Sequence, residues 1–151
     1  MKITKRGEYA LKALLALAFV HGQRTLNLRE ISEQEKLPVK FLEQIMMVLK
    51  RGGFVQSTKG KHGGYALSRT PREITVGEII RVVDGPLAPL ASAKEIESQI
   101  QREEHHPGLY AVLLDVRNAI SEILDHKSLA DICSRSLELA HAHPKNQMYF
   151  I

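Results

Sequence analysis

The sequence predicts a mostly α-helical fold with a small β-hairpin wing: a winged helix-turn-helix domain followed by a long dimerisation helix. Three observations favour this fold class. Two amphipathic stretches meet at Leu37-Pro38, a basic, glycine-rich turn interrupts residues 54–68, and apolar residues recur at helical spacing over 107–126. The predicted regions are the winged helix-turn-helix domain over 1–85, a linker or effector segment over 86–106, and the dimerisation helix with a C-terminal tail over 107–151.

The first two helices have clear start signals. Thr4 is a candidate N-cap for an amphipathic helix over 5–21, which Gly22 would end. Asn27 and Glu30 are spaced as a capping box, in which each side chain bonds the backbone N–H of the other residue. A short second helix is therefore predicted from residue 28.

A third helix is predicted from Pro38 to about Arg51, because proline suits a first helical turn and disfavours helix at the residue before it. Two helices joined by a short turn form a helix-turn-helix. The predicted apolar side of the third helix consists of Phe41, Leu42, Ile45, Met46, Val48 and Leu49.

A β-hairpin is predicted directly after the third helix. Residues 54–58 and 65–68 are two short β-prone stretches, and the basic, glycine-rich segment 59–64 lies between them. A hairpin with a basic tip beside the second helix of a helix-turn-helix is what a DNA-contacting wing requires. The remaining predicted helices run from a capping box at Thr75 to Val83, from Ser92 to about His105, from Pro107 to about His126, and onward from Ser128.

The charge is divided unevenly along the chain. The 151 residues carry a net charge of +4. Residues 1–81 hold 15 Lys and Arg against 7 Asp and Glu, a net +8, whereas residues 82–151 hold 6 against 10, a net −4. A basic first half predicts a polyanionic partner for that half only.

The composition excludes several other classes of protein. No apolar run approaches the roughly 20 residues of a membrane span, and a single cysteine, Cys133, excludes an intramolecular disulfide framework. No nucleophile elbow, phosphate-binding loop or zinc-protease motif is present. We therefore expect a cytoplasmic protein that is not an enzyme and has no membrane partner.

The long helix over 107–126 would extend about 30 Å, too far to be buried within so small a domain. Two arrangements are open: antiparallel packing against the same helix of a second copy, and folding back on its own domain. The first predicts a homodimer. Its expected interface residues are Leu109, Val112, Leu113, Val116, Ile120, Ile123 and Leu124.

Five sequence segments, taken in their order along the chain, are characteristic of a known family: residues 1–10, 41–44, 49–55, 60–65 and 74–80. Together they resemble the Rrf-type winged-helix transcription regulators, the group of IscR, NsrR and CymR. The resemblance is close over about the first 85 residues and looser over the long helix. It implies a DNA-binding transcriptional regulator, expected to act as a repressor that binds a pseudo-palindromic operator as a homodimer.

The N-terminal part of the second helix of a helix-turn-helix enters the major groove. This places Val39, Lys40, Glu43 and Gln44 near base edges, where Glu can accept from cytosine and Gln can pair with adenine. A carboxylate beside phosphates is unfavourable, so Glu43 indicates base reading; the alternative is a solvated helix face. Further expected DNA contacts are Lys5, Arg6, Lys50, Arg51, Lys59, Lys61, His62 and Tyr65. The wing glycines Gly60, Gly63 and Gly64 belong to the same predicted DNA-binding site.

Similar proteins usually carry Arg at the wing position that Lys59 occupies here. Arg gains more from a narrow minor groove than the strongly hydrated Lys does. Sequence reading by the wing is therefore expected to be weaker in this chain, whereas the three wing glycines are expected to permit tight turning and close approach to DNA.

Many members of the resembled family hold an iron–sulfur cluster with three cysteines between the fourth helix and the dimer helix. No cysteine lies between Gly85 and Leu109 here, and serine hydroxyls are poor cluster ligands. We expect a CymR-like member with no iron–sulfur cluster, no other cofactor and no metal site. His105 and His106 are expected to be surface histidines; the alternative is a metal site that Glu103, Glu104, His141 and His143 complete through the fold or across a dimer. Cys133 is expected to be a buried structural thiol instead of a redox sensor.

The last residues, Met-Tyr-Phe-Ile, are apolar, although chain termini are normally solvated. They resemble the C-terminus of CymR-type members, which act with cysteine synthase. Phe150 and Ile151 would then dock into a partner protein, with the Ile151 carboxylate accepting charge-assisted hydrogen bonds; the other interpretation is packing on the protein's own dimer. The alternative function is an interaction adaptor, for example for cysteine synthase, in which DNA reading has degenerated.

Overall fold

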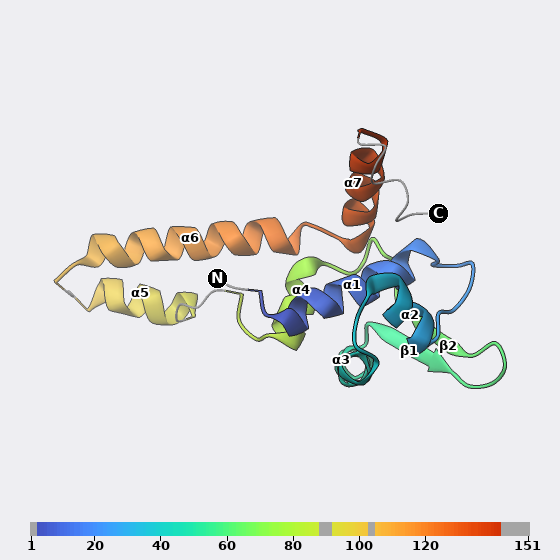
Figure 1. The fold of residues 1–151 in the computed structure, drawn as a ribbon. Helices are drawn as coiled ribbons and strands as arrows, with labels where there is room; N and C mark the ends of the chain where they lie inside the picture. The colour runs from blue at the N-terminus through green and yellow to red at the C-terminus, as the bar shows by residue number, and fades with distance from the viewer. Residues whose placement is uncertain (1–2, 88–91, 103–104, 143–151) are drawn as a thin grey trace.

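Side-chain caps begin most helices of the computed structural model, which describes residues 3–87, 92–102 and 105–142 (Figure 1). Thr4 Oγ1 accepts from the Gly7 N–H, and the predicted capping boxes at Asn27 and Thr75 are both formed. The elements are α1 (Lys5–Phe19), α2 (Leu28–Glu35), α3 (Val39–Arg51), β1 (Val55–Thr58), β2 (Gly64–Leu67), α4 (Val76–Val83), α5 (Ala93–Gln101), α6 (Pro107–Asp125) and α7 (Leu129–Ala142).

The predicted order of helices and strands is confirmed, with small shifts at their ends. α1 ends at Phe19, two residues before the predicted end, and α5 ends at Gln101 instead of near His105. Pro38 is the N-cap of α3 and not its first helical residue. Pro107 occupies the first turn of α6, as predicted.

The first four helices and the hairpin form a lobe around an aliphatic core. α1 contacts α2, α3, α4 and α7, and so lies at the centre of the lobe. The fully buried side chains at its core include Leu14, Leu17, Leu42, Ile45, Leu49 and Phe54. Burial of these side chains from α1, α3 and the residue before β1 fixes α3 and the hairpin relative to each other.

The hairpin pairs β1 with β2 in antiparallel register, from Val55 opposite Leu67 to Thr58 opposite Gly64. A third segment joins this sheet, because the Tyr65 N–H donates to the Leu26 carbonyl at 2.7 Å and the Leu26 N–H donates back at 3.0 Å. These two bonds attach the hairpin to the chain segment between α1 and α2.

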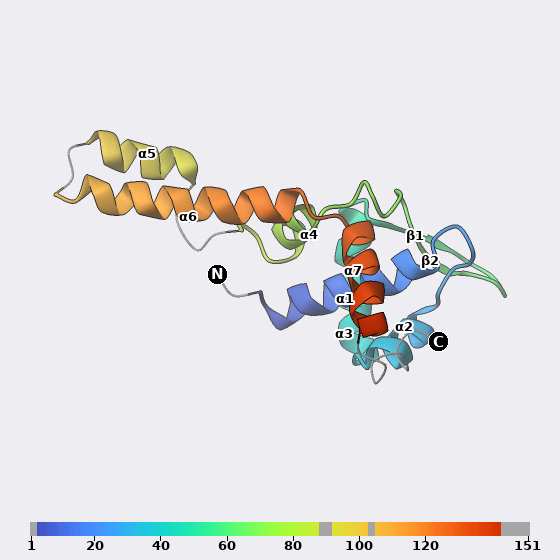
Figure 2. The ribbon, with the colours of Figure 1, turned by 90° about the horizontal axis from the view of Figure 1, so that it is seen from above.

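α5 and α6 form an antiparallel pair that projects from the lobe as an arm (Figures 1 and 2). The arm is joined to the lobe through a second cluster, in which Val76 and Ile80 of α4 pack with Leu87, Ile120 and Leu124. Beyond α6 the chain returns to the lobe, where the Leu129 N–H donates to the Ile74 carbonyl at 2.9 Å and α7 lies against α1.

Two sequence predictions about burial are wrong. Phe41 is 37% exposed, because α3 turns that side chain to the rim of its buried face, where the ring meets Tyr9 edge to face at 5.7 Å. Cys133 is only half-buried on α7; burial raises the pKa of its thiol, in keeping with the expected unreactive cysteine. No helix within the described ranges has the length and apolarity to cross a membrane.

Candidate DNA-binding interface

α3 is divided into a buried face and an exposed face. Leu42, Ile45, Met46 and Leu49 are buried, which anchors the helix to the lobe along its length. The residues predicted to lie near base edges share the opposite, exposed face; they are Val39, Lys40, Glu43 and Gln44. Met47, 55% exposed, extends the same face by one turn.

This exposed face has the chemistry that base reading requires. It presents a cation, a carboxylate, an amide and apolar carbon within little more than two helical turns, and such groups can contact base edges and thymine methyl groups. Phe41 was not among the predicted site residues, yet its partly exposed ring lies at the N-terminal end of α3, beside Val39 and Lys40 in sequence. In the sequence, Phe41 belongs to the segment 41–44 that carries the family resemblance, but the apolar pattern places it on the apolar side of the helix instead of the DNA-contacting side.

The predicted phosphate-contacting cations differ in how they are engaged. Lys5 Nζ pairs with Glu8 at 2.9 Å, and Lys50 Nζ donates to Ser57 Oγ of β1 at 2.6 Å. Hydrogen bonding to Glu8 raises the pKa of Lys5. Among the described residues, no carboxylate lies within 4.0 Å of the exposed Arg6, Lys40, Arg51, Lys59 and Lys61.

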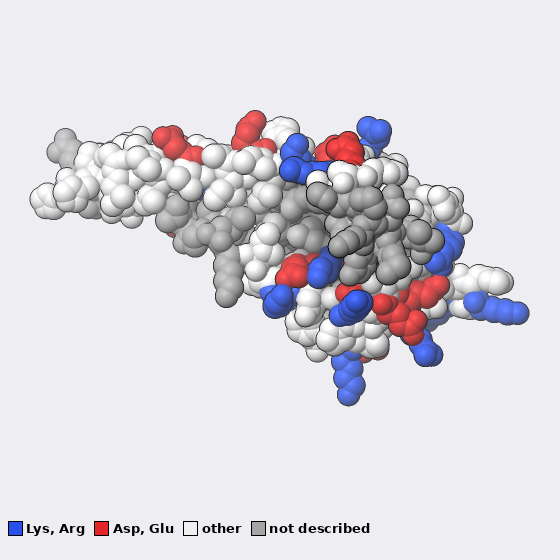
Figure 3. All heavy atoms as spheres, turned by 45° about the horizontal axis from the view of Figure 1, so that its top comes forward, with Lys and Arg blue, Asp and Glu red and all other residues white. Residues whose placement is uncertain are grey.

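The distribution of charge over the surface follows that of the sequence. On the face shown in Figure 3, most of the Lys and Arg side chains lie on the lobe and several project from it. The arm shows mostly uncharged and acidic side chains on the same face. The lobe therefore offers the basic surface that a polyanion would contact.

The wing glycines occupy positions that a side chain would disturb. Gly60 has a φ of +113°, in the region that favours glycine, and a Cβ on Gly63 would collide with the Thr58 carbonyl oxygen. Tyr65 serves the wing through its backbone bonds to Leu26, while its ring packs partly buried against the core. The carbonyl of His62 accepts from Thr25 Oγ1 at 3.1 Å, which ties the wing tip to the lobe.

We expect Gly64→Ala to loosen the wing. A Cβ at Gly64 would lie 2.7 Å from the Leu26 carbonyl oxygen, a backbone atom that can move only if the bonds between Leu26 and Tyr65 break. Overpacking of this kind costs about 1–3 kcal/mol, which lowers the melting temperature by several degrees. The matched control is Gly108→Ala, because nothing lies within 4 Å of a Cβ there. Equal melting temperatures for the two variants would contradict the assigned role of Gly64.

The structure separates the predicted dimer residues of α6 into two groups. Ile120 and Leu124 pack against the cluster of α4, and Leu113 is partly buried. The others lie on an exposed apolar stripe, with 48–59% of each side chain accessible: Leu109, Val112, Val116 and Ile123. With the exposed Ala119 they follow a spacing of three and four residues, the seam of a two-helix packing.

The residues of this chain do not fit an iron–sulfur cluster. The single cysteine is Cys133, half-buried on α7 with a raised pKa, whereas cluster ligation uses several thiolates. In the part of the chain that the structure describes, no three His, Cys, Asp or Glu residues gather as metal ligands would. His105 and His106 are exposed, as predicted. Phe150 and Ile151, predicted to dock into a partner, lie outside the described residues.

Comparisons with known proteins agree on one class. Residues 3–135 match the model of the family Rrf2, described as an iron-dependent transcriptional regulator. The HTH-type transcriptional regulator CymR of Bacillus subtilis is 34% identical over 134 residues, which cover 89% of this chain and 91% of that protein. A putative rrf2-like regulator of Rhodobacter capsulatus is 42% identical over 91 residues, or 58% of this chain and 61% of that protein.

Solved structures show the same similarity. The structure of CymR, the global cysteine regulator of B. subtilis, matches with a TM-score of 0.74 at 34% identity and covers 89% of this chain and 98% of that one. IscR of T. potens matches with a TM-score of 0.70 at 34% identity, covering 90% and 88% of the two chains. The winged-helix prediction for the fold is thereby confirmed.

Proposed function

The chain belongs to the Rrf2 family of transcriptional regulators, and from this we propose that it is a repressor that binds a pseudo-palindromic operator as a homodimer. The family and its relatives are DNA-binding regulators and not enzymes. The observation that carries the proposal is the exposed face of α3. The polar and apolar side chains of this face are exposed, and four buried side chains on the opposite face of α3 fix the helix to the core.

The homodimer is supported by the exposed stripe of α6. Four large apolar side chains along one line are unusual on the surface of a monomer, and a second copy of the same helix would cover them in an antiparallel packing. The polar side of α6, with Asp115, Asn118 and Glu122, is also exposed and would stay in water. A two-fold dimer would present two α3 helices to two half-sites, and occupancy of the operator would block transcription.

We propose that Glu43 contacts a base and Lys59 contacts the DNA backbone. We therefore expect Glu43→Ala and Lys59→Ala to change DNA binding in different ways. Glu43 lies on the exposed face of α3 without an ion pair among the described residues, free to accept from a base. Its loss should relax preference at one position of each half-site by about 1–3 kcal/mol. Lys59 is at the wing tip, and its loss should weaken all DNA sequences alike.

The measurement is the affinity of each variant for a set of operators with every single-base substitution. Lys61→Ala, a second exposed cation of the wing, is the control for loss of charge and should behave as Lys59→Ala does. Identical selectivity profiles for the Glu43 and Lys59 variants would contradict the proposed division.

We also propose that the protein acts without an iron–sulfur cluster. The proposal is supported by the donor set, a single half-buried cysteine. Protein purified without oxygen is expected to be colourless and to hold less than about 0.1 iron per chain, since one thiolate cannot replace the usual set of cluster ligands. Absorbance at about 400 nm with matching iron and sulfide would contradict this proposal, because cluster charge-transfer bands depend on such ligation.

The signal is proposed to concern sulfur status, since the similar CymR of B. subtilis is described as a cysteine regulator. Cysteine synthase as a partner of Phe150 and Ile151 stays a prediction. The adaptor function is less well supported than DNA binding, because an adaptor needs neither the exposed face of α3 nor exposed cations such as Arg6, Lys40 and Arg51 that have no carboxylate in reach among the described residues.

A further inference from the structure

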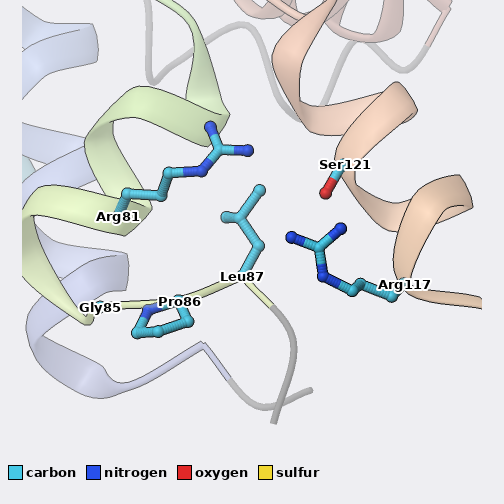
Figure 4. Close-up of a pocket in the computed structure, with 6 residues that line it drawn as sticks. All are labelled: Arg81, Gly85, Pro86, Leu87, Arg117 and Ser121. Carbon is cyan, nitrogen blue, oxygen red and sulfur yellow. The ribbon is translucent and has the colours of Figure 1, made fainter. Parts of the chain in front are cut away.

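A pocket of about 380 Å³ lies where the arm meets the lobe. Its walls come from the end of α4, the turn after it and the middle of α6, and Figure 4 shows the side chains around it. The lining residues are Arg81, Gly85, Pro86, Leu87, Arg117 and Ser121. Two guanidinium groups and a hydroxyl thus share one space with an apolar wall.

Arg81 already has its counter-ion. Its two terminal nitrogens donate to the two carboxylate oxygens of Asp125 at 2.5 and 2.8 Å, a bidentate pair that holds the pKa of Asp125 below its usual range. Gly77 leaves the room for that carboxylate, because a Cβ there would overlap an Asp125 oxygen. The charge of Arg81 is therefore largely neutralised within the chain.

Arg117 has no such partner within the described part of the chain. Among the described residues, its side chain donates one hydrogen bond, to Asn118 Oδ1 at 3.4 Å, a long and neutral contact, and no described carboxylate lies within 4.0 Å of it. The side chain is half-buried, so part of its hydration is lost without an opposite charge in return. Ser121 lies one turn further along α6, and its side chain faces the same pocket (Figure 4).

We propose that this pocket binds a small organic anion, whose carboxylate or phosphate group pairs with Arg117 and Ser121. The planar guanidinium can donate two parallel hydrogen bonds to such a group, and the hydroxyl can donate a third. The buried Leu87 and the ring of Pro86 offer an apolar wall to a short aliphatic body. A free inorganic anion could satisfy the polar groups but would leave that wall in water.

The site lies on the side of α6 that faces α4, away from the exposed stripe. Ile120 and Leu124 on that side contact the α4 cluster, so a second copy seated on Val116 and Ile123 would leave Arg117 facing its own lobe. A ligand held between α4 and α6 would bias the angle of the arm to the lobe, and with it the separation of two α3 helices. This regulatory role rests on the proposed dimeric DNA binding, whereas the binding site itself does not.

The test is NMR of the arginine Nε–H groups of the full chain, with the Arg117 signal assigned by its loss in Arg117→Gln. Sodium butyrate and inorganic phosphate are titrated at constant ionic strength, with butyramide as the uncharged match for butyrate. We expect the Arg117 signal to shift as butyrate or phosphate is added, and the shift to saturate at an anion concentration of up to roughly 50 mM. A single charge-assisted pair allows an affinity in this range. Butyramide should produce no such shift.

In the Arg117 variants, binding is followed by the Nε–H signal of Arg81, which lines the same pocket. Arg117→Gln is expected to lose at least about tenfold in affinity and Arg117→Lys somewhat less, since Lys keeps the charge but cannot donate two parallel hydrogen bonds. Arg135→Gln, an exposed arginine of α7, is the control, and Ser121→Ala serves if the Arg117 variants do not fold. Three results would overturn the site: no saturable shift with either anion, undiminished binding by Arg117→Gln, and an Arg117 signal that responds only to protein concentration. The last of these would mean that a carboxylate of a second copy occupies the site.

The regulatory role is tested on the same samples with operator DNA. The regulatory role is supported if butyrate or phosphate changes the operator affinity of the native chain but not that of Arg117→Gln. An unchanged operator affinity of the native chain overturns the regulatory role but not the binding site. If the protein binds the anion but no DNA at any salt concentration, the proposed function fails and the site does not.

Discussion

Replacing Val116 by aspartate is expected to dissociate the protein into monomers and to weaken operator binding about a thousandfold. Val116 lies in the middle of the exposed stripe of α6, between Val112 and Ile123. In a two-fold packing the substitution would bury two uncompensated carboxylates, each at a cost of at least about 2 kcal/mol, and about 4 kcal/mol in total corresponds to about a thousandfold in affinity. A monomer would also lose the contribution of the second half-site.

The matched control is Asn118→Asp, which adds the same charge on the exposed polar side of the same helix. Sedimentation analysis and operator binding by fluorescence anisotropy should distinguish the two variants, and the melting temperature shows whether each still folds. A Val116→Asp protein that remains dimeric and binds DNA as the native chain does would remove the stripe from the interface.

A fourfold rise in monovalent salt is expected to lower operator affinity about a thousandfold. Five of the exposed cations predicted to contact DNA have no carboxylate in reach among the described residues, including Arg6 near the start of α1 and Arg51 at the end of α3. Six or more phosphate contacts in a dimer give a slope near −5 in log K against log salt, since each contact contributes about −0.9.

The slope is measured by anisotropy titrations across a salt series, and Arg51→Gln should reduce it by about 2 for a dimer, one contact in each subunit. Arg135→Gln, on α7 and outside the proposed interface, should leave it unchanged. An affinity that does not change with salt would mean that the basic lobe does not contact the phosphate backbone.

Features that depend on local sequence could be predicted from the chain alone. The cap at Thr4, the capping boxes and Pro107 act within one helical turn, so their patterns set the helix starts wherever the rest of the chain lies. The wing could be predicted for a similar reason, because its glycines and short strands follow α3 directly.

Features that depend on tertiary contacts could not be predicted in the same way. Helical spacing marks Ile120 and Val116 alike as apolar, yet only the fold determines that Ile120 packs on α4 and Val116 remains exposed. Arg81 and Arg117 are far apart in sequence but line the same pocket. Arg81 is neutralised by its ion pair with Asp125, whereas Arg117 is not. No local pattern contains that difference.

The central claim is that two α3 helices read a symmetric operator, and selection of bound fragments from a random duplex DNA library tests it most directly. The full chain at near-physiological salt is expected to enrich one sequence with two inverted half-sites, about one helical turn apart or a multiple of it. The Glu43→Ala protein should relax one position in each half-site of that sequence. Enrichment of no sequence, or of a single half-site without its inverted repeat, would contradict the claim.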